Sequence, residues 1–428
     1  MQTRLMLNLN RLRKRLWVKP LVYCLLAIVA TTLAKGADFL DPLDRLPEID
    51  PDTVETLLSI ISSTMMMMAT FAVGSMVAAY ASASDNATPR AFQLVLTDDM
   101  SQTALSSFVG AFIFSVVAIV ALKTGIYENP GHFVLLGLTI AVIGWVVLTF
   151  VRWVDNIARL GRMSSTIDRA EKAARECLAE RRRQPHLGGR AASEAPKAAG
   201  TVIHADRIGY LQLVDVAQLQ EVAEDASVQV VVEALPGTFV SPDQPLMRLI
   251  GAKAHDHELR KRLTKAFVIG SDRTFEADPR FGLIVLSEIA QRALSPGVND
   301  PGTAIAIVGR LVRLFAFWLA PEDDGEDKEA EDGDEEQCDR VFVPALDLAD
   351  MFDDAFTGIT RDGAGNIELG IRLQKAFASL ATLGNGAARA EAERHARLAI
   401  ARAEATISLE QDLDRLRKAA GAILQPTG

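Results

Sequence analysis

The sequence predicts a membrane protein in which four transmembrane α-helices precede a mixed α+β cytoplasmic domain, itself a small barrel-like β unit plus a helical bundle. The first observation is three stretches without Asp, Glu, Lys or Arg, at residues 56–84, 100–122 and 129–151. Each is long enough for a helix to cross a hydrocarbon core of about 30 Å. The second is a change near Thr201 from long apolar runs to short ones that are typical of strands.

The first span is shorter than the other three. Its apolar core, Leu21–Leu33, has 13 residues. Trp17 and its neighbours extend it to about 17 residues by lying in the membrane interface. Because a basic arm precedes this segment, a cleaved signal peptide is an alternative. The residues that follow Leu33 form a poor cleavage site, which favours a retained span.

Lysine and arginine are distributed unevenly between the two sides. Six basic and no acidic residues precede the apolar core of the first span. Residues 36–55 contain one arginine and seven acids, whereas residues 152–183 contain nine basic residues. Since cytoplasmic loops carry the excess of positive charge, we expect both termini in the cytoplasm. A cleaved first span would leave the C-terminal part on the same side.

The net charge of −10 comes from one segment. Residues 321–340 contain 12 acidic and two basic residues, while the rest of the chain contains 43 of each kind. This segment is too polar to be buried, so we expect a disordered insert. An otherwise neutral chain gives no support to nucleic-acid binding. The three cysteines are too far apart in sequence to predict a disulfide framework or a metal knuckle.

The second span carries a stripe of small, weakly polar residues. At about 100° per residue, Ser59, Ser63, Thr70 and Gly74 project onto one face of the helix. Close helix packing through small residues is one interpretation, and the lining of a water-filled path is the other. No charged residue lies deep inside a span, which argues against ion-coupled transport, because coupled transporters normally carry such residues.

Polar residues gather at the cytoplasmic start of the third span, where the sequence has Asp98, Asp99 and Gln102. In one interpretation the acids cap the helix and interact favourably with its positive end. In the other, Asp99 repeats around a homo-oligomer and forms an acidic ring that attracts cations. The expected partners are therefore the lipid bilayer and further copies of the chain, and the sequence identifies no cytoplasmic partner.

The cytoplasmic part begins as a charged helix that runs to Arg183 and continues into a linker rich in Gly, Ala, Pro and Ser. Short strands, with a helix between two of them, are expected from Thr201 onwards. The stretch Gly237–Ile250 resembles the hairpin of barrel-sandwich domains of the biotinyl and lipoyl type. No lysine occupies its tip, so a structural barrel is expected here and a carrier function is not.

A rigid Pro/Gly turn follows at residues 292–301. The sequence predicts a helix end, the turn, and a new helix with Asp300 at its N-cap and Pro301 at its first position. In an alternative interpretation, Ser295, Asn299 and the free amides of the new helix hold an anion or the backbone of a partner.

Five features of the chain occur together: the four spans, Thr88-Pro89-Arg90, Asp98-Asp99-x-x-Gln102, Arg273-Thr274 with Asp278, and the turn motif Ala-Leu-Ser-Pro-Gly-Val-Asn-Asp-Pro-x-Thr-Ala. Together they resemble an uncharacterised bacterial family of predicted membrane proteins, domain of unknown function 2254. The likeness extends from Arg13 to Leu416, and the turn motif is its specific part. It implies a multi-pass protein of the bacterial inner membrane and transfers no established activity.

Known catalytic spacings do not occur in the sequence. It lacks the motifs GxxxxGK[ST], HExxH and GxSxG as well as the Gly-rich dinucleotide turn, so we expect neither an enzyme nor a cofactor. His255 and His257 would lie about 200° apart on a helix, and they predict no metal site by themselves. Arg273 and Asp278 are expected to form a turn contact, while either is also a candidate for lining a cytoplasmic ligand site.

These observations divide the chain into seven regions: a basic interfacial arm (1–16), a four-helix transmembrane domain (17–152), a helical extension and linker (153–200), a small barrel-like β unit (201–252), a helical region with the turn (253–320), an acidic disordered insert (321–340) and a C-terminal helical region (341–428). Two functions are compatible with this layout. The first candidate function is an oligomeric conduit for ions or small solutes with a cytoplasmic regulatory domain. The second candidate function is a membrane-tethered sensor or scaffold whose cytoplasmic domain binds a partner or ligand.

Overall fold

The computed structural model describes residues 18–36, 49–86, 88–96, 99–160, 162–251, 256–321, 338–384 and 386–424. The chain forms two compact units, one that ends at Thr166 and one that begins at Ile167. They are called here the N-terminal unit and the C-terminal unit. The basic arm expected at 1–16 and residues 322–337 of the expected acidic insert lie outside the described residues.

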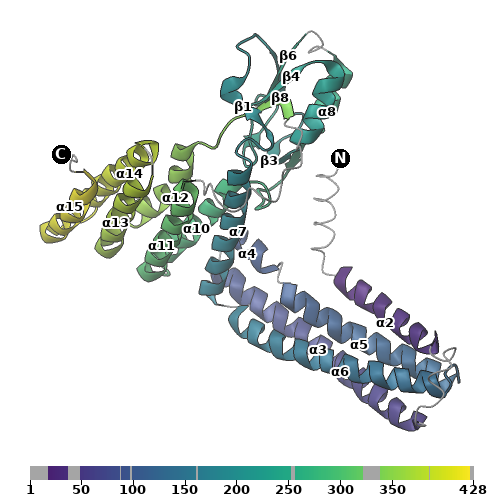
Figure 1. The fold of residues 1–428 in the computed structure, drawn as a ribbon. Coiled ribbons are helices and arrows are strands. Elements are labelled where there is room, and N and C mark those ends of the chain that lie inside the picture. Colours follow the sequence, from purple (N-terminus) through teal and green to yellow (C-terminus); the bar gives the residue numbers. More distant parts are fainter. Residues whose placement is uncertain are drawn as a thin grey trace. The chain divides into compact units, whose positions relative to one another are not determined.

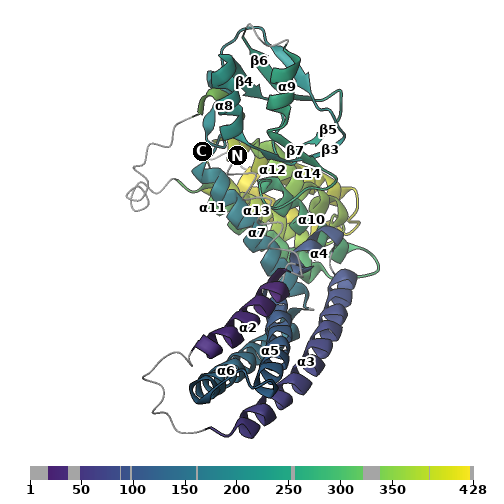
Figure 2. The same ribbon diagram turned by 90° about the vertical axis from the view of Figure 1, so that its right-hand side faces the viewer.

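The N-terminal unit is a bundle of long helices with α5 at its centre (Figure 2). Its helices are α2 (Val18–Gly36), α3 (Pro51–Asn86), the short α4 (Pro89–Leu96), α5 (Asp99–Lys123) and α6 (Asn129–Leu160). α5 contacts each of the other three long helices. Small and apolar residues occur on all its sides, which is the composition that allows a helix to be surrounded by others.

Within the part of the chain that the structure describes, five helices are long and apolar enough to cross a membrane: α2, α3, α5, α6 and α11 (Pro301–Leu319). The first four coincide with the expected spans. α11 belongs to the C-terminal unit, and the sequence assigned it to a cytoplasmic helical region. Its apolar residues include Ile307, Leu311 and Phe315, which are buried against other helices of that unit. Length and composition alone therefore do not fix the number of spans at four.

The charged helix expected after the fourth span is interrupted. α6 ends at Leu160, and α7 (Met163–Arg183) begins two residues beyond Gly161. Arg162, between the two helices, is not helical, so α6 and α7 are separate elements.

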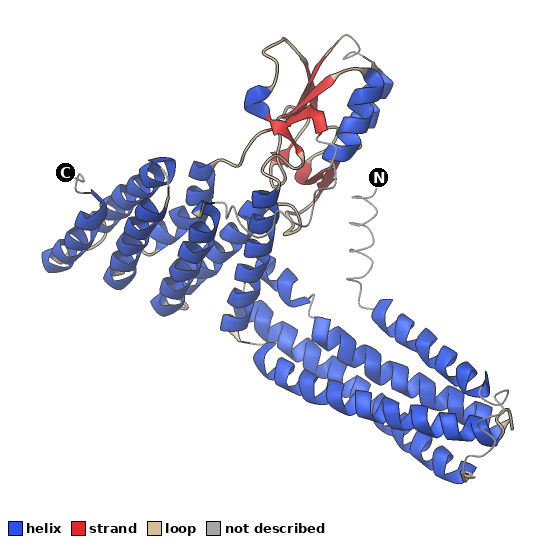
Figure 3. Ribbon diagram, in the orientation of Figure 1, coloured by secondary structure: helices blue, strands red, loops and turns tan. Residues whose placement is uncertain are grey.

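The described strands of the C-terminal unit form two sheets (Figure 3). They are β1 (Gly189–Ala191), β2 (Thr201–His204), β3 (Gly209–Val214), β4 (Gln229–Val232), β5 (Phe239–Val240), β6 (Pro245–Ile250), β7 (Phe267–Gly270) and β8 (Cys338–Val343). The larger sheet has the order β1-β8-β4-β6-β2 and the smaller one the order β5-β3-β7. Residues of both sheets share one apolar core with α8 (Val216–Ala226) and α9 (His257–Thr264).

The barrel-like unit expected at 201–252 is observed only as part of this mixed sheet region. β5 and β6, expected as a hairpin, pair with different strands: β5 with β3, and β6 with β2 and β4. β8 lies between β1 and β4, although its first residues fall in the expected acidic insert. Its residues Val341, Phe342 and Val343 are all buried, as is typical of a strand covered on both faces.

The described helices that follow β7 form a stack of two rows (Figure 1). α10, α12 and α14 contact one another in succession in one row, and α11, α13 and α15 do so in the other. The bounds not yet given are α10 (Pro279–Leu294), α12 (Leu348–Asp362), α13 (Ile367–Leu383), α14 (Gly386–Glu404) and α15 (Glu410–Leu424). The sequence predicts one helix over 387–423, but β-branched Thr406 and Ile407 lie where α14 and α15 separate.

Candidate functional site

The stripe of α3 lies on the exposed side of the N-terminal unit. Ser59, Ser63, Thr70 and Gly74 are all exposed, and a side chain at Gly74 would meet no atom within 4 Å. The opposite face of α3 is buried and apolar: Val54, Leu58, Ile61, Met65, Ala69, Ala72 and Met76. Among the described residues, the stripe therefore takes no part in helix packing within the chain.

The stripe begins at an open groove of about 460 Å³. The groove is lined by Asp52, Glu55, Thr56, Ser59, Ile60 and Ser63. Glu55 pairs with Lys123 at 2.6 Å. The Ser63 hydroxyl donates to the Ser59 carbonyl at 3.0 Å, so its own oxygen can still accept a hydrogen bond. The groove thus combines carboxylates with hydroxyl oxygens.

Asp99, at the start of α5, does not have a free carboxylate. Lys19 of α2 pairs with the Asp99 carboxylate, and its ammonium group also donates to the Thr103 hydroxyl at 3.2 Å. Gln102 is buried within the bundle. Asp98 lies outside the described residues. The charge of Asp99 is thus compensated within the chain, which weakens the interpretation of an acidic ring.

Small residues of α5 serve close packing instead. A Cβ atom on Gly110 would be 2.9 Å from Cβ of Tyr23, so only glycine lets α2 approach this closely. The buried Ser106 hydroxyl donates to the carbonyl of Gln102 one turn earlier. Ser107 accepts a hydrogen bond from the Trp145 indole at 3.0 Å. The polar groups of α5 are therefore used inside the bundle.

The Pro/Gly turn has the local structure that its sequence predicts. Asp300 is the N-cap of α11 and accepts a hydrogen bond from the Thr303 amide at 3.0 Å, with Pro301 in the first turn. Asn299 has a positive φ of 50°, which asparagine tolerates better than most residues. The Ser295 hydroxyl donates to the Arg292 carbonyl at 2.7 Å. The carboxylate of Asp300 already occupies the place where an anion would bind the helix start.

Arg273 meets Asp278 rather than the turn. Its guanidinium donates two hydrogen bonds to the Asp278 carboxylate, at 2.7 and 3.0 Å. Asp278 is buried and is also the N-cap of α10, where it accepts from the amides of Arg280 and Phe281 at 3.2 Å. One carboxylate therefore receives four donors, two from a side chain and two from the helix start. The side chains of Arg273 and Asp278 are therefore both engaged in hydrogen bonds at the start of α10.

Arg280 links the starts of α10 and α12. It pairs with Asp350 and, at 2.6 Å, with Asp354. Burial raises the pKa of Asp354 although the positive charge of Arg280 acts in the opposite direction. The pair joins the first two helices of one row of the stack.

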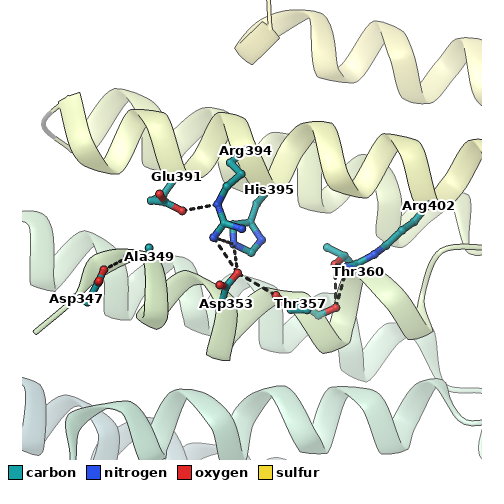
Figure 4. A network of polar contacts seen from close by, with 9 residues as sticks. All are labelled: Asp347, Ala349, Asp353, Thr357, Thr360, Glu391, Arg394, His395 and Arg402. Carbon is teal, nitrogen blue, oxygen red and sulfur yellow. Dashed lines mark hydrogen bonds and ion pairs between the residues drawn. The ribbon is translucent and has the colours of Figure 1, made fainter. Parts of the chain in front are cut away.

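A second polar network joins α12 to α14 and was not apparent from the sequence (Figure 4). Asp353 accepts hydrogen bonds from Arg394 at 2.8 Å and from Thr357 at 3.3 Å. His395 Nε2 lies 3.2 Å from the same carboxylate. Burial alone would raise the pKa of Asp353, but the hydrogen bond and charge of Arg394 lower it. The carboxylate is thus ionised and shared between two side chains of α14.

The His395 ring is buried among three aromatic rings, those of Phe352, Phe356 and Phe377. Burial, together with the positive charge of Arg394, lowers the pKa of His395 to about 4. Its neighbours come from α12, α13 and α14, so no local pattern identifies it. The i, i+4 spacing of Phe352 and Phe356 is the one signal that the sequence contains.

Among the described residues, no group of three or more His, Cys, Asp or Glu side chains is placed to hold a metal ion. Of the expected site residues, the stripe of α3 lies on one exposed face, while Asp99 and Gln102 lie on α5. Arg273 binds Asp278 at the N-cap of α10. Ser295 lies at the C-cap of α10 and Asp300 at the N-cap of α11, with Asn299 next to Asp300.

The model of a family described as predicted membrane protein (DUF2254) matches residues 13–379, which is most of the chain. The protein belongs to this family. The membership confirms the resemblance drawn from the spans and the turn motif. As a DUF2254 protein it has several apolar helices, in agreement with the family's description as membrane proteins.

Similar curated proteins carry no assigned function. Two uncharacterized proteins, one from Mycobacterium bovis and one from Mycobacterium tuberculosis, are each 24% identical over 343 residues. The match covers 76% of this DUF2254 chain and 64% of the length of each relative. No solved structure matches the chain.

Proposed function

We propose that the protein is an oligomeric conduit for ions or small polar solutes, built from several copies and regulated by the C-terminal unit. The observation that carries this proposal is the exposed stripe of α3. Ser59, Ser63 and Thr70 lie away from the contacts within the chain, and their oxygens can accept hydrogen bonds from water. If several copies surrounded a water-filled axis, these residues would be in contact with water. Lipid hydrocarbon would offer their hydroxyl groups no hydrogen-bonding partner.

The groove at the start of the stripe supports the proposal that the solute is a cation or a polar molecule. Asp52 and Glu55 contribute carboxylates next to the hydroxyl groups of the groove. Negative groups at the mouth of a path raise the local concentration of cations. Asp99 at the start of α5 supports this less, because Lys19 compensates its charge.

For the topology we propose four spans, with both termini in the cytoplasm of the inner membrane. The distribution of Lys and Arg supports this orientation. α11 is the fifth apolar helix, but Arg310 and Arg313 both pair with Glu171 of α7, at 2.6 and 2.8 Å. A helix that carries two such ion pairs, and that packs between helices with charged exposed faces, is better suited to an aqueous compartment than to lipid.

The test is flux through liposomes that contain the purified, full-length protein. We expect potassium flux in the wild type and a several-fold loss in Ser63→Leu, because leucine removes a hydroxyl from the stripe and narrows the path. Thr64→Leu is the matched control, since Thr64 is exposed on the same helix but lies off the stripe. An absence of flux from protein that has been shown to be oligomeric would reject the conduit.

The alternative proposal is a membrane-tethered sensor or scaffold. The two-row stack of α10 to α15 favours it, because stacked helix pairs present extended surfaces that many proteins use for binding. Intact Ser63→Leu protein that still performs its cellular role would support the scaffold. Neither proposal assigns a catalytic reaction, and the hydroxyl of Ser295 and the carboxylate of Asp300 are both engaged in helix ends.

A further inference from the structure

Arg181 lies on the buried face of α7, and Ala174 of the same face packs against α10. This face consists of Ile167, Ala170, Ala174, Cys177, Leu178 and Arg181. Ala174 lies so close to Gly282 of α10 that no side chain would fit at Gly282. Asp278 is one turn before Gly282, and Arg181 is about two turns after Ala174. The two helices therefore bring the guanidinium of Arg181 toward the capped start of α10.

The guanidinium of Arg181 is buried without a counter-ion of its own. The residue is 3% exposed, and neither Nη1 nor Nη2 has a hydrogen-bond partner among the described residues. Asp278 is the carboxylate whose charge acts on it, but both oxygens of Asp278 are already taken by Arg273 and by the first amides of α10. Glu180, next to Arg181 in sequence, is exposed and pairs with Arg183.

Acidic as well as basic groups surround Arg181. Arg273 adds a second positive charge and pairs with Asp278, while the negative charges of Asp278, Glu276 and Glu180 all act on the adjacent Cys177. Burial raises the pKa of the Cys177 thiol to about 12, so this neighbour remains neutral. A buried arginine without a partner is rare because its transfer from water is costly.

From this geometry we propose that the guanidinium of Arg181 binds a compact oxyanion of the size of inorganic phosphate, beside the start of α10 that Asp278 already caps. An oxyanion supplies the acceptors that the two terminal nitrogens lack, and guanidinium binds phosphate through two parallel hydrogen bonds. Because the guanidinium is already enclosed, a small anion fits this place better than a nucleotide does. The site is independent of the conduit, since it uses only residues of the C-terminal unit.

The test is the thermal midpoint and calorimetric titration of the full-length protein in detergent, with phosphate compared against chloride at equal ionic strength. We expect phosphate to raise the midpoint of the wild type and to give a saturable heat of binding. Arg181→Met should lose both responses and should be more stable than the wild type in phosphate-free buffer, because it removes an uncompensated charge. Arg183→Met, an exposed position on the same helix, should respond as the wild type does.

Three outcomes would overturn the proposal. The first is equal stabilisation by chloride and phosphate, which would indicate a general salt effect. The second is a phosphate response that persists in Arg181→Met, which would place the anion elsewhere. The third is a wild type that does not bind phosphate, which would mean that water or the chain itself satisfies Arg181. If Arg181→Met does not accumulate, Arg181→Lys keeps the charge but loses the two parallel bonds, so weaker phosphate binding is expected.

Discussion

A single side chain, His395, makes the stability of the protein depend on pH. Burial lowers its pKa from 6.5 to about 4, so the folded state favours the neutral ring. The resulting contribution to the free energy of unfolding is complete above pH 6.5 and is lost as the pH falls through 4. By linkage the loss amounts to at most about 3 kcal/mol. We expect the thermal midpoint to fall over this interval.

The control for this titration is His395→Phe. Phenylalanine keeps an aromatic ring among Phe352, Phe356 and Phe377 but does not titrate. Whatever its absolute stability, the variant should therefore show a shallower fall in midpoint between pH 6.5 and 4. Equal slopes in the two proteins would assign the pH dependence to other groups.

Gly110 tests how tightly α2 and α5 are packed. Gly110→Ala places a Cβ atom 2.9 Å from Cβ of Tyr23, so we expect a loss of about 1–3 kcal/mol from overpacking. Gly137→Ala on α6 is the matched control, because a side chain there meets nothing within 4 Å. That variant should be neutral or slightly more stable, as alanine favours a helix over glycine. Thermal midpoints in detergent that shift equally for both variants would contradict the close contact.

At the scale of the element, two helix starts with the same capping residue should differ in their sensitivity to mutation. Asp278→Ala removes the cap of α10 and leaves the half-buried Arg273 without its partner, so we expect a loss of about 3–5 kcal/mol. Asp347→Ala removes one capping bond, from the Ala349 amide, at an exposed position of α12. There we expect about 1 kcal/mol. If urea unfolding curves give similar losses of unfolding free energy for the two variants, the ion pair between Arg273 and Asp278 adds little to the stability.

Elements whose ends are determined locally could be predicted from the sequence. The sequence predicts a helix over residues 367–383, and α13 has these bounds, because Asn366 caps its start and Gly384 follows its end. The cap at Asp300 was predicted for the same reason. β8 could not be predicted in this way, because its neighbours β1 and β4 lie more than 100 residues earlier in the chain. The same is true of His395, whose surroundings come from three helices.

At the scale of the whole molecule, the number of spans can be measured. If α11 does not cross the membrane, cysteines introduced at Val298 and Ala320 should both react with a membrane-impermeant maleimide from the cytoplasmic side. Both positions are exposed in the C-terminal unit. A cysteine at Ile126, exposed between α5 and α6, should react from the opposite side. The native Cys24, Cys177 and Cys338 are first replaced by alanine. Labelling of Val298 and Ala320 from opposite sides would make α11 a fifth span.

The position of β8 also has a consequence for the order in which the protein is made. The larger sheet cannot close while the chain is emerging from the ribosome until residues 338–343 are available, which is after α10 and α11 have been synthesised. Until then β4 has an unpaired edge and β1 has no strand beside it. Such edges invite pairing with other chains. A nascent chain whose residues 338–343 are still inside the ribosome should therefore depend on chaperones far more than one in which they have emerged.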